Sequence, residues 1–186
     1  MALNPEQYED LLEDMKPENL WAGSKWEYFI RGSNQIKGRF GEQIVMRDLK
    51  EQGWNSEVNS GHDFDVLVEG KYRLEVKIAA SRKGDRASGA KILVDSMQWQ
   101  HLNILEDKCD AFAFVGVNPD INYCFKKGGR TEFDEVFILY FTSQQLVDFL
   151  EDKETKYLYK QYNGTMTGKT FLSLIDYGKN YKKFTP

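Results

Sequence analysis

The stretch GHDFDVLVEGKYRLEVKIA, residues 61–79, decides the fold, because its apolar residues recur at nearly every second position. A period of two is that of a β-strand, whose successive side chains point to opposite faces of a sheet. The pattern predicts two strands, 64–69 and 72–79, joined by a tight turn that contains Gly70. We therefore interpret this stretch as a β-hairpin.

The same alternation sorts the charged residues of the hairpin. The first strand places Asp63 and Asp65 on one face and Phe64, with the valines that follow it, on the other. The second strand places Glu75 and Lys77 on one face, opposite its apolar residues. If both apolar sets pack on one core, Asp65, Glu75 and Lys77 converge on the opposite side.

Two carboxylates and an ammonium in such an arrangement favour a metal site. Neighbouring carboxylates repel each other unless a cation lies between them, and ligand sets made of oxygen alone select Mg²⁺ or Mn²⁺. Such a metal activates water and polarises a phosphodiester, while Lys77 neutralises charge on phosphorus. The alternative is a solvated strand face, on which ion pairs contribute under ~1 kcal/mol each.

The rest of the chain reads as alternating helices and strands, which indicates an α/β fold with one sheet. Apolar periodicity and caps predict helices at 5–15, 20–31, 34–52, 95–106 and 143–150. Further strands are predicted at 54–58, 111–117, 121–125 and 136–141. We expect Asp95 and Ser143 to cap the last two helices, with Gln98 closing a capping box on Asp95.

Composition excludes several classes of protein. No run of eighteen apolar residues is present, so no membrane span is expected, and the acidic start of the chain lacks the pattern of a secretory signal. Two cysteines without a CxxC pair indicate a cytoplasmic protein with reduced thiols and no structural zinc. The GTMTGKT stretch at 164–170 has the wrong spacing for a phosphate loop, so no nucleotide cofactor is expected.

Asp65 with VLV after it, and LEVK at 74–77, resemble the signature of the PD-(D/E)xK nuclease superfamily. The resemblance covers about residues 34–117. It implies a restriction endonuclease-like αβββαβ core, with a mixed central sheet flanked by helices. It also implies that Asp65 and Glu75 bind the metal and that Lys77 is the catalytic lysine. Phe64 stands where the proline of the superfamily's name would be.

The resemblance further implies a metal-binding glutamate on the preceding helix, and Glu42 occupies that position. The alternative for Glu42 is an ion pair with Arg39 or Lys50 at the helix edge. Asp63 shares a face with Asp65 and competes with it for the metal. Asp65 is favoured because it directly precedes the apolar run.

The expected function is Mg²⁺-dependent hydrolysis of double-stranded DNA, with Mn²⁺ able to substitute. A restriction-type endonuclease is the first interpretation, and symmetric double-strand cutting would need a homodimer. A structure-specific repair or resolvase-type nuclease, or an inactive DNA-binding module on the same fold, are the alternatives. DNA phosphates are the expected ligands of four bases in the loop 81–91, unless that loop is a solvated turn: Arg82, Lys83, Arg86 and Lys91.

The expected domain organisation is a single nuclease domain over residues 1–186. Its core spans about 34–150, with a helical N-terminal extension at 1–33 and a C-terminal extension at 151–186. The net charge of −4 does not contradict a DNA partner, because the bases are concentrated in a few segments and local potential governs phosphate binding.

Overall fold

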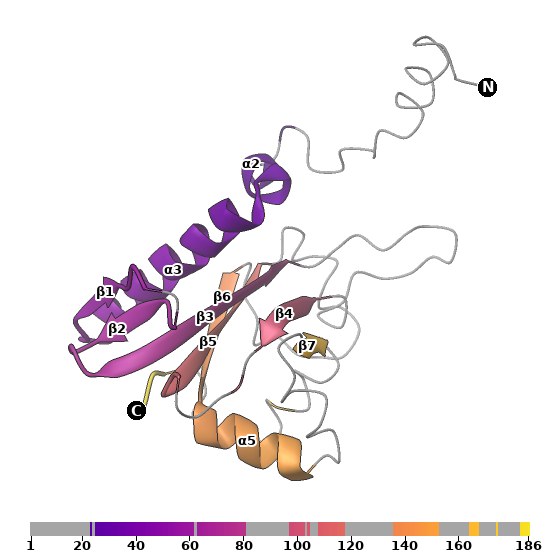
Figure 1. The fold of residues 1–186 in the computed structure, drawn as a ribbon. Helices are drawn as coiled ribbons and strands as arrows, with labels where there is room; N and C mark the ends of the chain where they lie inside the picture. Colours follow the sequence, from indigo (N-terminus) through magenta and orange to yellow (C-terminus); the bar gives the residue numbers. More distant parts are fainter. Residues whose placement is uncertain are drawn as a thin grey trace. The chain divides into compact units, whose positions relative to one another are not determined.

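The structure, a computed structural model, divides into two compact units, Met1–Arg31 and Gly32–Pro186 (Figure 1). It describes residues 23, 25–61, 63–80, 97–102, 104, 108–117, 136–152, 164–167, 174 and 183–186. The helix predicted at 5–15, the strand predicted at 121–125 and the basic loop at 81–91 lie outside these ranges. In the first unit, α2 (Glu27–Arg31) falls within the helix predicted at 20–31 and carries an ion pair of 3.2 Å between Arg31 and Glu27.

The second unit is built on a five-stranded sheet with the order β1-β2-β3-β5-β6 (Figure 1). Its strands are β1 (Ser56–Val58), β2 (Val66–Val68), β3 (Tyr72–Ala80), β5 (Ala111–Val117) and β6 (Val136–Thr142). β3 and β5 run parallel, and the other neighbours are antiparallel. With α3 (Asn34–Glu51) and α5 (Ser143–Asp152) packed on it, this mixed sheet confirms the predicted α/β class.

Both turns that frame the hairpin region follow from local sequence. Ser33 caps α3 by accepting a hydrogen bond from the Ile36 N–H at 3.3 Å, and Gly53, with a φ of 91°, follows the end of the helix. Glu69 and Gly70 have φ values of 53° and 61° in the turn between β2 and β3. Positive φ at both central residues is the pattern of a type I′ turn, which suits the twist of a hairpin.

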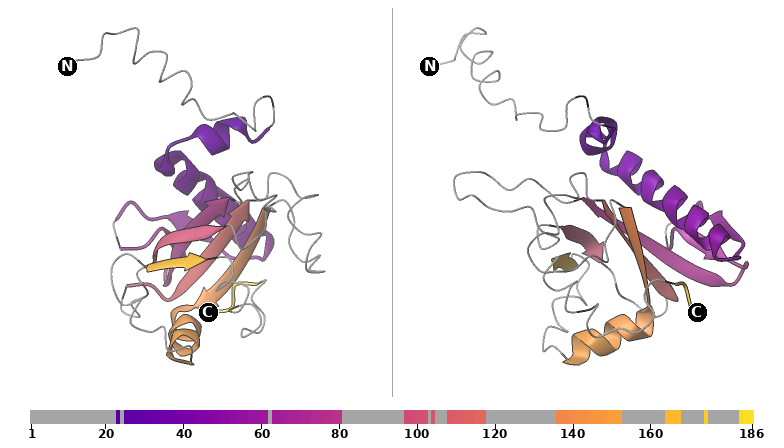
Figure 2. Two further views of the ribbon diagram at one scale, coloured as in Figure 1. Left: turned by 90° about the vertical axis from the view of Figure 1, so that its right-hand side faces the viewer. Right: turned by 180° about the vertical axis from the view of Figure 1, so that it is seen from behind.

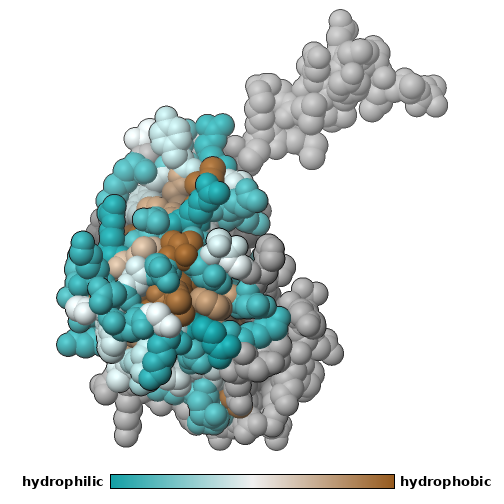
Figure 3. Space-filling view, turned by 60° about the vertical axis from the view of Figure 1, so that its left-hand side comes forward, coloured by the Kyte–Doolittle hydropathy of each residue, from teal (hydrophilic) through white to brown (hydrophobic). Residues whose placement is uncertain are grey.

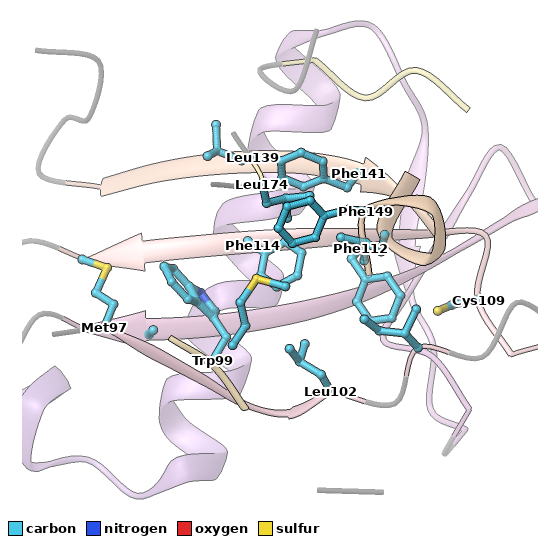
Figure 4. Packing of buried hydrophobic residues seen from close by; sticks show 14 of the residues in the cluster. Met97, Trp99, Leu102, Cys109, Phe112, Phe114, Leu139, Phe141, Phe149 and Leu174 are labelled. Atoms are coloured by element: carbon cyan, nitrogen blue, oxygen red, sulfur yellow. The ribbon is translucent and has the colours of Figure 1, made fainter. Parts of the chain in front are cut away.

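The sheet is covered on both faces, which we call the helix face and the ribbon face (Figure 2). On the helix face, α3 packs over a cluster of Val45, Leu49, Val66, Val68, Leu74, Ala111, Ala113, Val115, Tyr140 and Phe184. On the ribbon face lie α5 and a two-stranded ribbon of β4 (Gln98–Leu102) and β7 (Gly164–Thr167). The buried side chains there include Met97, Trp99, Leu102, Phe112, Phe114, Leu139, Phe141 and Phe149 (Figure 4). All of β5 is buried, which confirms the strand predicted from its uncharged run.

The helix predicted at 95–106 is wrong, because the described part of this segment forms β4. Met97 and Trp99 are fully buried while Gln98 and Gln100 are exposed, which is the alternation of a strand. A register shift between Trp99 and Leu102 lets the buried side change phase, as a β-bulge does. That phase change gives the apolar residues a spacing that imitates helical periodicity.

The cap of α5 differs by one residue from the prediction. Thr142 Oγ1 accepts from the Gln145 N–H at 3.1 Å, and Gln145 Oε1 accepts from the Thr142 N–H at 2.8 Å. This reciprocal pair is a capping box with Thr142 as the N-cap. Ser143 is buried instead, and its hydroxyl donates to the Cys109 carbonyl at 2.6 Å.

The described C-terminal residues complete the helix face. Phe184 packs edge-on against Trp54, Tyr72 and Tyr140, with ring centroids 5.6, 6.2 and 5.8 Å away. Its N–H donates to Gln52 of the α3 C-cap at 2.9 Å. The C-terminal end therefore contributes to the core rather than lying apart from it.

The surface is mostly polar. Figure 3 shows one face, on which hydrophilic side chains surround a group of apolar ones. The exposed large apolar side chains of the second unit, within the described ranges, are Ile36 and Val58. No helix among the described residues is long and apolar enough to span a membrane.

Candidate metal centre

Asp65 lies at the open end of β2, where the hairpin ladder stops. Its N–H donates to the Leu74 carbonyl at 3.1 Å, and the register of the hairpin places it opposite Glu75. β2 begins at Val66, so it does not extend to the Val76 N–H on β3. Asp65 Oδ2 accepts that N–H at 2.7 Å in place of a strand carbonyl. The carboxylate is thereby fixed at the edge of the sheet, between its two faces.

Glu75 and Lys77 lie on the ribbon face of β3. Their neighbours Leu74, Val76 and Ile78 belong to the helix-face packing, so alternation turns the charged pair the other way. The Lys77 ammonium lies 2.6 Å from Glu75 Oε1, and the two side chains are only 17% and 21% exposed. A half-buried ion pair at this distance fixes both side chains, unlike the solvated pairs of an open strand face.

Glu42 approaches Asp65 from the helix face. It lies on α3 one residue after Gly41, where any β-carbon would come within 3.4 Å of side-chain atoms of Val76 and Ile78, so the helix passes close to β3 here. Burial raises the pKa of Glu42, the negative charge of Asp65 raises it further, and Arg39 lowers it. Glu42 is therefore close enough to sense both Asp65 and Arg39.

The electrostatics of the site favour a bound cation. Burial raises the pKa of Asp65, against the Val76 N–H and Lys77, which lower it. Burial also raises the pKa of Glu75; Lys77 lowers it, and the charge of Asp65 raises it. Asp65 thus interacts with Glu42 on one side and Glu75 on the other, and positive charge placed at Asp65 would relieve both repulsions.

The donors fit a hard cation that keeps much of its water. Among the residues that the structure describes, no three Asp, Glu, His or Cys side chains are grouped closely enough to hold a metal ion by themselves. Mg²⁺ is commonly bound through one or two carboxylates, with water and substrate phosphate completing an octahedron. Asp65 and Glu75 meet that requirement, and Glu42 is placed to hold a water or a second ion.

The first hairpin segment departs from the predicted alternation. Phe64 packs against the ribbon-face cluster, whereas Val66 belongs to the helix-face cluster, so these two residues do not share a face as predicted. The backbone leaves the strand geometry at Asp65, because that residue bonds to Val76 through its side chain. Asp63 is consequently turned outward: its side chain is 75% exposed and its Oδ1 lies 3.9 Å from the Lys108 ammonium. This placement favours Asp65 over Asp63 as the metal ligand.

Sequence reasoning missed the tether that supports the site. Asp110, which precedes β5, accepts from the Arg73 N–H at 2.8 Å and from the Arg73 guanidinium at 3.2 and 3.0 Å. These bonds hold the pKa of Asp110 below its usual value. Arg73 and Asp110 are far apart in sequence, and only the β3–β5 register brings them together.

The remaining predicted site residues are not tested by the structure. Arg82, Lys83, Arg86 and Lys91 all lie outside the described residues. Gln98 is exposed on β4, in the ribbon, and not on a helix as predicted.

The pKa of Glu42 predicts an effect on stability. Because its folded-state pKa lies above the ordinary 4.5, its contribution to stability is fully present below pH 4.5 and is lost as pH rises through the folded pKa. We expect Glu42→Gln to melt at a higher temperature than wild type at neutral pH in EDTA, and the gap to close on acidification. Thermal melts at several pH values test this, with Glu57→Gln, an exposed residue of β1, as the control. A gap that widens on acidification would contradict the assignment.

No protein family model and no curated protein matches the sequence. The fold is similar to the solved structure of a bacterial homing endonuclease, I-Ssp6803I, with a TM-score of 0.37 and 14% sequence identity. The match covers 73% of this chain and 78% of that chain. At this score and identity, the similarity does not assign an activity to this chain.

Proposed function

We propose that this chain is a Mg²⁺-dependent endodeoxyribonuclease of the PD-(D/E)xK type that hydrolyses double-stranded DNA, in the manner of a restriction endonuclease. One observation carries the proposal. Asp65 is held at the end of β2 by the Val76 N–H, between Glu42 on the helix side and the Glu75–Lys77 pair on the ribbon side. Two half-buried carboxylates beside a half-buried lysine suit phosphodiester chemistry better than they suit fold stability.

Each residue has a part that follows from its place. Asp65 and Glu75 bind the metal, and Glu42 holds a water or a second metal. Bound Mg²⁺ supplies neutralising charge at the phosphodiester and a lower pKa for the attacking water. Lys77 keeps Glu75 ionised and presents an ammonium that orients the water and stabilises charge on the pentacovalent phosphorus.

Supercoiled plasmid incubated with the full-length protein tests the proposal. We expect nicked and linear products with Mg²⁺ or Mn²⁺ and none with EDTA. Discrete fragments from linear DNA would support the restriction-type interpretation, and preference for branched substrates would support a repair-type nuclease. DNA that is bound but uncut with either metal would indicate an inactive binding module, and DNA neither bound nor cut would overturn the proposal altogether.

A further inference from the structure

A second cation, Lys108, lies at the same site and was not anticipated from the sequence. It precedes Cys109, which is buried, and Asp110, whose N–H donates to the Arg73 carbonyl at 2.8 Å. Two residues after Lys108, the backbone is therefore fixed to the start of β3. Lys108 is a residue of an anchored segment rather than of a free surface loop.

Its ammonium reaches the acidic residues around Glu75. It lies 3.9 Å from Asp63 Oδ1, two residues before Asp65, and its positive charge lowers the pKa of Glu75. Lys108 thus reaches from the start of β5 toward the residues that would meet DNA.

The partner of Lys108 is weakly held. A distance of 3.9 Å is at the outer limit of an ion pair, and the two side chains are 37% and 75% exposed. Exposed pairs of this kind contribute little, so exchanging Asp63 for another anion costs little. Lys77, in contrast, is engaged with Glu75 at 2.6 Å. A DNA strand approaching Asp65, Glu75 and Glu42 meets three carboxylates, so a loosely held cation beside them reduces the repulsion.

We propose that Lys108 binds a phosphate oxygen of the DNA backbone beside the cleaved phosphodiester, leaving Asp63 to do so; this inference rests on the proposed function. Asp63 is then the resting partner of Lys108 and not a ligand of the metal. Lys108 acts on binding and register, because a phosphate contact positions the duplex without reading its sequence.

Binding of a fluorescein-labelled DNA duplex, followed by anisotropy in EDTA across a series of salt concentrations, tests the inference without any need for cleavage. Removing one phosphate contact lowers the slope of log affinity against log salt by about 0.9, which is a loss of roughly fivefold to tenfold at moderate salt. We expect Lys108→Ala to show both effects and Lys108→Arg to restore affinity. The matched control is Lys50→Ala, which removes the same charge from an exposed residue at the far end of α3.

Three outcomes separate the inference from the function on which it rests. Wild type that binds duplex, with Lys108→Ala equal to Lys50→Ala, overturns the role of Lys108 alone. Wild type that neither binds nor cuts DNA overturns both proposals. Asp63→Asn is expected to retain wild-type affinity or exceed it, and to keep the rise in melting temperature that Mg²⁺ gives the wild type. Loss of that rise would make Asp63 a metal ligand and contradict its assignment here.

Discussion

Lys77→Met is expected to reduce the initial rate of plasmid cleavage by roughly 10²–10³, the usual effect of removing one preorganised electrostatic contact from a catalytic site. Methionine keeps the length and the apolar stem of the lysine, so the packing of β3 on the ribbon face changes little. The ammonium that lies 2.6 Å from Glu75 is lost. What remains is a site with both carboxylates and without the cation that stabilises the reacting phosphate.

The same substitution should change the dependence of the rate on pH. Lys77 lowers the pKa of Glu75 and of Asp65, so both pKa values rise when the ammonium is removed. Activity needs ionised carboxylates and is lost as pH falls through their pKa values, so the variant should lose its residual activity at a higher pH than wild type. Initial rates over a pH series measure this effect. Lys50→Met serves as the control, and a Lys77→Met enzyme with wild-type rate and pH profile would remove Lys77 from the mechanism.

The hairpin and its acids can be predicted because their information is local. Strand alternation places Glu75 and Lys77 on one face, and the turn residues Glu69 and Gly70 specify the hairpin. The α3 helix likewise carries its own periodicity, its cap and its terminating glycine. Each of these features depends on residues within a few positions of one another, which is the range over which periodicity and turn chemistry act.

The errors arise where a non-local contact overrides the local pattern. Phe64 leaves the face of Val66 because Asp65 bonds to a main-chain N–H on β3 instead of continuing the strand. The local pattern predicts a helix in place of β4 because the bulge of this strand is needed only when it pairs with β7. Lys108 joins the site only through the parallel pairing of β3 with β5. No single window of sequence contains both partners of these contacts.

The ribbon is expected to be essential to stability, through Trp99. This side chain is fully buried on the ribbon face, its indole N–H donates to the Val115 carbonyl at 3.0 Å, and its ring meets Phe114 edge-on at 6.0 Å. It therefore joins β4 to the central strand β5. Trp99→Ala removes a large buried ring and leaves a cavity, so we expect the free energy of unfolding to fall by about 3–5 kcal/mol.

Trp99→Phe divides this loss into its two parts. Phenylalanine retains most of the ring contact and loses the hydrogen bond, whose net contribution is about 1 kcal/mol. Urea unfolding followed by circular dichroism measures both variants, and the midpoint should fall further for alanine than for phenylalanine. Equal and small shifts, under about 1 kcal/mol on the scale of core substitutions, would mean that the ribbon is not packed on the sheet through Trp99. Because Glu75 and Lys77 share the ribbon face, a destabilised ribbon should also expose Lys77 to water and weaken its pairing with Glu75.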